Sequence, residues 1–251
     1  MDRRARRTPR QPPPPDEFGI VLALLCAVYL TYTLTPATWA HWIVGVVYLG
    51  ALFFAVRTSR PGPRMQRLVR IVLVAGAAVS VTALVVLPHD AAIGVLDAVS
   101  CVLLGTTLAT VLGRVLSHRE VTGSTIAGAV SAYLIIGLLF TNIYGVLDWV
   151  LPGPFFAGGQ PADQQSLQYF SFTTLTTVGY GDYTAASFPG RGVATFEALV
   201  AQVFLATLVA RLVAAYRRRY PTPPPDPVPP SPLAAPRPLP PNCHFGGFWR
   251  T

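Results

Sequence analysis

Apolar residues are gathered in six long runs, separated by short polar, charged or proline-rich stretches. Each run holds about 18 to 24 residues, which is the length an α-helix needs to cross the hydrocarbon core of a bilayer. The pattern therefore predicts an all-α membrane protein with six transmembrane helices. We place them at residues 18–35, 39–56, 68–87, 93–116, 124–147 and 192–215.

Between the fifth and sixth runs lies a semi-apolar segment, 166–175, which is too short to span a membrane. We predict that it is a re-entrant helix, with Asp163 or Ser166 as its N-cap. A glycine-spaced loop, Thr-Thr-Val-Gly-Tyr-Gly-Asp at 176–182, follows directly. The C-terminal end of the re-entrant helix carries partial negative charge and would favour a cation near this loop.

Composition agrees with a membrane protein that crosses the bilayer several times. The 251 residues are 52% hydrophobic and 12% charged, and their mean hydropathy is +0.47. The net charge of +8 would favour nucleic acid in a soluble protein, but all 19 basic residues are arginines at the ends of the runs and in the tails. We therefore expect no nucleic-acid partner. Cys26, Cys101 and Cys243 fit neither a disulfide framework nor a metal site.

The chain divides into four predicted regions. Residues 1–17 are rich in arginine and proline and residues 221–251 in proline, so we predict two disordered tails. Between them we predict a four-helix transmembrane domain at 18–119 and a second domain at 120–220. A signal peptide is the competing interpretation of the first run, but no convincing small-residue cleavage site follows it.

The arginines also predict the orientation in the membrane. If both termini are cytoplasmic, eighteen arginines lie on the inner side and only Arg191 lies outside, as the positive-inside rule requires. The outer side then carries Asp90, Asp148, Asp163 and Asp182. We therefore predict a multi-pass plasma-membrane protein with cytoplasmic N- and C-termini, whose re-entrant loop enters from outside.

The glycine-spaced loop has residue types that suit the coordination of a dehydrated cation. Successive side chains and carbonyls of a regular strand alternate between opposite sides, whereas a cation needs several carbonyls on one side. Gly179 and Gly181 can adopt the φ values that remove this alternation. The hydroxyl of Thr177 can add a ligand, while Val178 and Tyr180 are expected to point away and pack against the protein behind the loop.

This loop, placed between a short helix and a last span, resembles the selectivity filter of the potassium channel family, and residues 122–220 resemble its bacterial two-transmembrane pore module. The resemblance implies a homotetramer in the lipid bilayer that conducts potassium passively, with potassium as permeant ligand and no cofactor. It also implies which backbone carbonyls bind the ion, namely those of Thr177, Val178, Gly179 and Tyr180. Gly181 completes the ion-binding set at the outer mouth, together with Asp182.

The resemblance further implies residues that support the filter, namely Thr174, Thr176, Tyr169 and Asp182. In the family, an aromatic side chain of the pore helix hydrogen-bonds the filter aspartate, and the matching pair here is Tyr169 and Asp182. Where the family often has a second tryptophan, this chain has Phe170, which cannot donate a hydrogen bond to Tyr180. Thr174 is the alternative donor.

The fourth run lacks the basic residues of a voltage sensor. Residues 93–111 contain no Arg or Lys, and Arg114 lies near the inner end. Moving one charge across the membrane is worth about 2.3 kcal/mol per 100 mV, so steep gating needs several charges per subunit. We therefore expect little intrinsic voltage gating. The sixth run has no glycine in its middle, so a hinge there is not expected either.

Three charged residues within the runs each have two interpretations. Asp97 is either a functional intramembrane carboxylate or a hydrated interfacial one. Glu197 faces either the re-entrant helix or a neighbouring subunit. Arg211 either reaches the lipid headgroups or lines the inner mouth.

Alternatives to a potassium channel are a nonselective cation channel and a membrane sensor or regulatory subunit with a silent pore. An enzyme has no support, because the sequence contains no clustered His/Cys/Asp/Glu site, nucleophile motif or phosphate-binding loop. The gating stimulus and the role of the first four spans do not follow from the sequence.

Overall fold

The computed structural model describes residues 18–34, 47, 50, 53, 63–117 and 123–219. Three predictions lie outside the described residues: the N-terminal arm 1–17, most of the second span 39–56, and the proline-rich tail 221–251.

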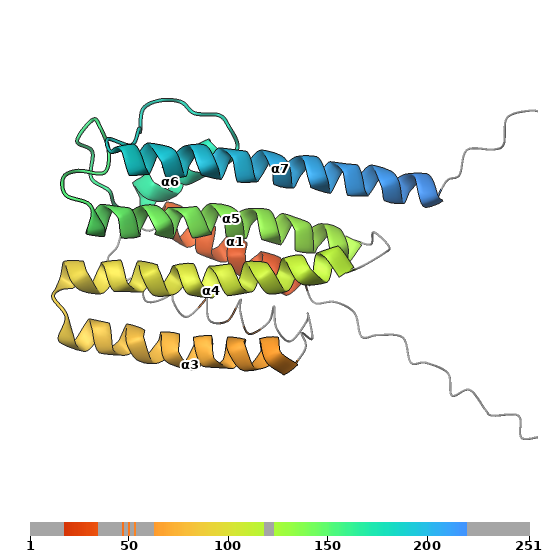
Figure 1. Ribbon diagram of the computed structural model, residues 1–251, viewed down its shortest axis with the longest axis horizontal. Coiled ribbons are helices and arrows are strands. Elements are labelled where there is room, and N and C mark those ends of the chain that lie inside the picture. The colour runs from red at the N-terminus through yellow and green to blue at the C-terminus, as the bar shows by residue number, and fades with distance from the viewer. Residues whose placement is uncertain are drawn as a thin grey trace, which may run out of the picture.

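Within the described residues the chain forms six helices and no strand, which confirms the predicted all-α fold (Figure 1). Four of the helices contain apolar stretches long enough to cross a membrane: Gln66–Val86, Asp90–Leu116, Thr125–Val150 and Phe188–Arg211. A shorter apolar stretch, Phe18–Thr31, lies in the first helix. The helices are α1 (Phe18–Leu34), α3 (Pro63–Val86), α4 (His89–Ser117), α5 (Gly123–Val150), α6 (Gln164–Leu175) and α7 (Phe188–Arg219).

Prolines explain two of the helix starts that come earlier than predicted, those of α3 and α4. Pro63 does not break a helix, because α3 begins at this residue. A proline has no N–H group, but the first turn of a helix has no partner for that group, and the fixed φ of proline suits the position. Likewise, α4 begins at His89, directly after Pro88, so the turn between α3 and α4 is only two residues long.

The antiparallel pair α4 and α5 lies at the centre of the bundle (Figure 1). Only five residues separate Ser117 from Gly123, so the two helices must be neighbours. The pairing also extends α5 beyond the predicted end at 147, because the ring of Trp149 lies over Gly94 of α4. A side chain at Gly94 would collide with this ring.

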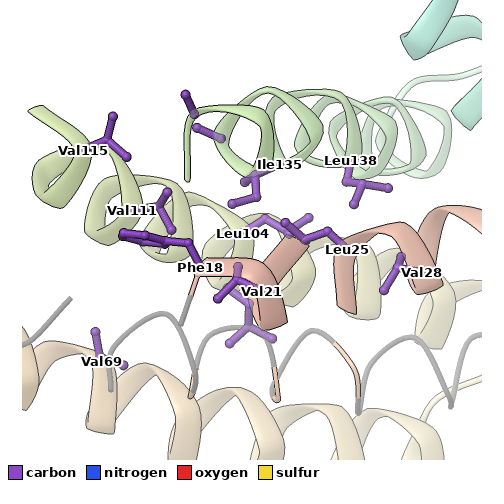
Figure 2. Close-up of a cluster of buried hydrophobic side chains, with 13 residues drawn as sticks. Phe18, Val21, Leu25, Val28, Val69, Leu104, Val111, Val115, Ile135 and Leu138 are labelled. Carbon is purple, nitrogen blue, oxygen red and sulfur yellow. The ribbon is translucent and has the colours of Figure 1, made fainter. Parts of the chain in front are cut away.

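Helix α1 packs on the central pair through an apolar cluster (Figure 2). Its contributing residues are three to four positions apart and therefore share one helix face. In a bilayer such a cluster is held by close packing rather than by exclusion of water. Its labelled members are Phe18, Val21, Leu25 and Val28 from α1, Val69 from α3, Leu104, Val111 and Val115 from α4, and Ile135 and Leu138 from α5.

Most of the described arginines lie at the opposite end of the bundle from four aspartates, and Arg191, at the start of α7, is an exception. The α3–α4 turn and both loops that flank α6 lie at one end, while the C-terminal ends of α4 and α7 lie at the other (Figure 1). Arg64, Arg67, Arg70, Arg114 and Arg211 belong to the helix halves nearest the second end, whereas Asp90, Asp148, Asp163 and Asp182 lie towards the first. This separation is what the positive-inside rule requires of the predicted orientation.

Candidate functional site

One of the two residues predicted as the N-cap of the short helix α6 has this role in the structure. Asp163 is the N-cap: its Oδ1 accepts a hydrogen bond from the backbone N–H of Ser166 at 2.8 Å. The helix then runs for 12 residues, a length of about 18 Å, which is too short to cross a bilayer. Its C-terminal end leads directly into the loop at 176–182.

The backbone of this loop has a positive φ at every second residue. The values are 58° at Thr177, 52° at Gly179 and 82° at Gly181. Such an alternation reverses the zigzag of a strand and lets consecutive carbonyl groups face the same side. The two glycines confirm the prediction from the sequence. Thr177 was missed, and for a β-branched residue this conformation costs on the order of 1–3 kcal/mol.

The loop turns its N–H groups back towards α6. Val178 N donates to the carbonyl of Thr173 at 2.9 Å and Gly179 N to the same carbonyl at 3.2 Å, while Thr177 N donates to Thr174 at 2.9 Å. Among the described residues, no hydrogen bond is accepted by the carbonyls of 177–180. These oxygens are therefore available to an ion.

Tyr169 and Asp182 form the hydrogen bond that the resemblance implied. The Tyr169 hydroxyl donates to Asp182 Oδ2 at 2.9 Å, and the Tyr169 ring stacks on Tyr180 with centroids 6.4 Å apart and planes 7° from parallel. Gln160 Nε2 also donates to the backbone carbonyl of Asp182 at 2.8 Å. The contacts connect the end of the loop to α6 and to the preceding loop.

Two other predicted contacts behave differently. No hydrogen bond joins Thr174 to Tyr180 within the described part of the chain. Val178 and Tyr180 are 52% and 72% exposed in the single chain, where Tyr180 stacks on Tyr169. Their packing against the protein behind the loop stays a prediction. Thr176 makes a local bond only, from its hydroxyl to the carbonyl of Phe172 at 2.7 Å, with a longer 3.5 Å contact to Thr173.

Backbone hydrogen bonds join residues 184–186, which follow the loop, to residues 155–157, which precede α6. Phe156 and Ala185 form an isolated antiparallel bridge, with N–H donation from Ala157 to Thr184 and from Ala186 to Phe155, both at 2.8 Å. Arg191 Nε donates to the carbonyl of Ala185 at 2.9 Å. The loop at 176–182 is thus held at both ends.

Two buried acidic side chains make contacts that the sequence did not specify. Glu197, on α7, is fully buried, and it contacts Tyr144 of α5 and Ser171 of α6. Asp97 is 5% exposed rather than hydrated, and its carboxyl lies against Gly145 of α5. A charged residue in an apolar run was the only signal that could have marked these positions.

Arg211 bonds to the end of α4 within this chain. Its contact with lipid headgroups or with the inner mouth of a pore stays a prediction. The Nη1 and Nη2 atoms of Arg211 donate to the carbonyls of Val115 and Leu116 at 3.1 and 3.3 Å. These carbonyls are at the C-terminal end of α4, where a helix has unsatisfied acceptors and partial negative charge. Arg211 therefore links the last helix to α4.

Comparison with known proteins identifies the part of the chain that contains this loop. Residues 129–218 match the model of a family described as "Ion channel". Comparisons with curated proteins and with solved structures gave no match. The matched residues include most of α5, all of α6, the loop at 176–182 and nearly all of α7. The loop therefore lies in a segment that is similar to an ion-channel family, in a chain with several membrane-length helices.

Proposed function

We propose that the protein is a potassium-selective channel in which four identical chains surround one axis and conduct passively. The observation that carries this proposal is the loop backbone, in which alternate positive φ values accompany carbonyls that accept no hydrogen bond among the described residues. Potassium would exchange its water shell for the carbonyl oxygens of Thr177, Val178, Gly179 and Tyr180. One chain supplies one edge of such a cage, so further copies are required.

Exposed apolar side chains support assembly around the loop. Val178 and Tyr180 are exposed in the single chain, and Phe196, Leu199 and Val203 form an exposed stripe on one face of α7. In a tetramer these groups would meet neighbouring copies. The four-helix domain at 18–119 would surround the pore domain at 120–220.

The distribution of charge supports a plasma-membrane protein with cytoplasmic termini and little voltage gating. The filter end of the bundle carries the aspartates and the opposite end most of the described arginines. Within α4, the basic residue of the last turn is Arg114. A purified channel should therefore show a conductance that changes only weakly with voltage, and a steep dependence without blocking ions would contradict this expectation.

Flux into liposomes that contain only the purified chain tests the proposal. We expect potassium uptake that barium blocks and that greatly exceeds sodium uptake. Gly179→Ala should abolish it, because φ at this position is 52°. Gly159→Ala is the matched control, since Gly159 has a φ of 72° but lies outside the loop.

Each of the other outcomes of the flux assay would support a different function. Equal potassium and sodium uptake would indicate a nonselective cation channel. No uptake, with intact tetramers, would indicate a sensor or regulatory subunit whose pore is silent. If Gly179→Ala and Gly159→Ala had equal effects, the loop at 176–182 would not be the conduction site.

A further inference from the structure

Glu197 is a fully buried carboxyl group within the membrane-length apolar stretch of α7. Two side chains from other helices hold it. The Tyr144 hydroxyl of α5 donates to Oε2 at 2.5 Å, and Ser171 Oγ of α6 lies 2.5 Å from Oε1. One carboxyl group thus joins the three helices α5, α6 and α7.

Counting protons favours a neutral form of this carboxyl group. Ser171 Oγ lies not only against Glu197 but also 2.8 Å from the carbonyl oxygen of Gly137, which can only accept. If Glu197 were ionised, the single hydroxyl proton of Ser171 could serve only one of the two oxygens. A neutral carboxyl group satisfies both contacts, because it donates to Ser171 and Ser171 donates to Gly137. It also keeps a net charge out of apolar surroundings.

The hydrogen-bonded group of Tyr144, Glu197 and Ser171, here called the bridge, contacts α6 just before the loop begins. Ser171 is followed within one turn by Thr173, whose carbonyl accepts the N–H groups of Val178 and Gly179. Helix α6 also touches α5 at Gly137, where an added Cβ would lie 2.7 Å from the ring of Phe172. A displacement of α6 would therefore move the loop directly.

We propose that Glu197 is a positioning residue for the filter: its neutral carboxyl group ties α7 and α5 to α6 and so holds the loop at 176–182 in its ion-binding conformation. This inference rests on the proposed function, because it concerns the same loop. Glu197 acts through Ser171 and α6, and it does not contact the permeant ion.

Two substitutions in the full-length protein test whether the filter needs the hydrogen bonds of a neutral group at position 197 or only the volume of its side chain. The amide of Glu197→Gln can accept from Tyr144 and donate to Ser171, as the neutral carboxyl group does. The side chain of Glu197→Leu can do neither. Thr195→Val is the matched control, since Thr195 is exposed on α7 and its hydroxyl bonds only to its own helix, at the carbonyl of Arg191.

Two readouts are needed in reconstituted protein. The first is amide hydrogen exchange in peptides that cover residues 176–179, and the second is the ratio of potassium to sodium flux. For Glu197→Leu we expect exchange about tenfold faster and a flux ratio about tenfold lower, because the buried hydroxyl groups of Tyr144 and Ser171 lose their contact with residue 197. Glu197→Gln and Thr195→Val should stay close to the wild type in both readouts.

Wild-type exchange and flux ratio in Glu197→Leu would overturn the proposal. Damage by Glu197→Gln equal to that by Glu197→Leu would also overturn it, since an ionised group would then be required. If Glu197→Leu fails to assemble, Ser171→Ala and Tyr144→Phe each remove one bond and keep the carboxyl group, and unchanged exchange in both refutes the bridge. A wild type without potassium-selective flux refutes the proposed function instead, while exchange still tests the bridge.

Discussion

Replacing Tyr169 with phenylalanine removes one hydroxyl group from the wall beside the candidate filter. In the structure this hydroxyl donates to Asp182 Oδ2 at 2.9 Å, and the ring stacks on Tyr180. Phenylalanine keeps the ring and its stacking, so the substitution isolates the hydrogen bond.

The expected effect follows from the chemistry and exposure of the bond. A hydrogen bond to a charged group is stronger than one between neutral groups. Tyr169 is 37% exposed, so solvent screening reduces the contribution of this bond. If the bond stabilises the conducting filter, Tyr169→Phe in all four subunits should shorten the open-state lifetime about fivefold.

Single-channel recording of the reconstituted protein measures this lifetime. Asp182→Ala and the double variant complete a cycle, in which the coupling between the two residues should change the lifetime about fivefold. Tyr183→Phe is the control, because Tyr183 belongs to the same aromatic group but its hydroxyl makes no hydrogen bond among the described residues. Unchanged lifetimes in Tyr169→Phe, or strictly additive effects in the double variant, would refute the reasoning.

Three further substitutions test the packing around the loop by thermal unfolding of the assembled protein. Gly137→Ala should destabilise it by about 1–3 kcal/mol, because the new Cβ would lie 2.7 Å from the ring of Phe172, whereas Gly105→Ala on α4, with open space around it, should be neutral or stabilising. Asp163→Ala should cost about 1 kcal/mol through loss of the α6 N-cap, and Asp163→Asn should retain most of it. Arg211→Gln should lose about 1 kcal/mol, since it gives up a cation at the C-terminal end of α4. Equal stability of Gly137→Ala and Gly105→Ala would contradict the contact at Gly137. Equal stability of Asp163→Ala and Asp163→Asn would contradict the N-cap. An unfolding temperature of Arg211→Gln equal to that of the wild type would contradict the contact of Arg211 with α4.

The sequence by itself determined the helical class, the approximate spans and the location of the loop. Apolar runs of membrane length report helices directly, because the backbone in a bilayer must satisfy its own hydrogen bonds. The two glycines at alternate positions likewise predicted an unusual backbone conformation in the loop, and both have a positive φ. These are local properties, which neighbouring residues are sufficient to define.

Tertiary structure decided what depends on contacts between distant segments. Thr177 adopts a positive φ that its own side chain disfavours, within a loop whose N–H groups bond back to Thr173 and Thr174 at the end of α6. Only the folded chain brings Glu197 to Tyr144 and Ser171, and Asp97 to Gly145. A carboxyl group in an apolar run has a partner because burial without one is costly, but the sequence does not say which residue that partner is.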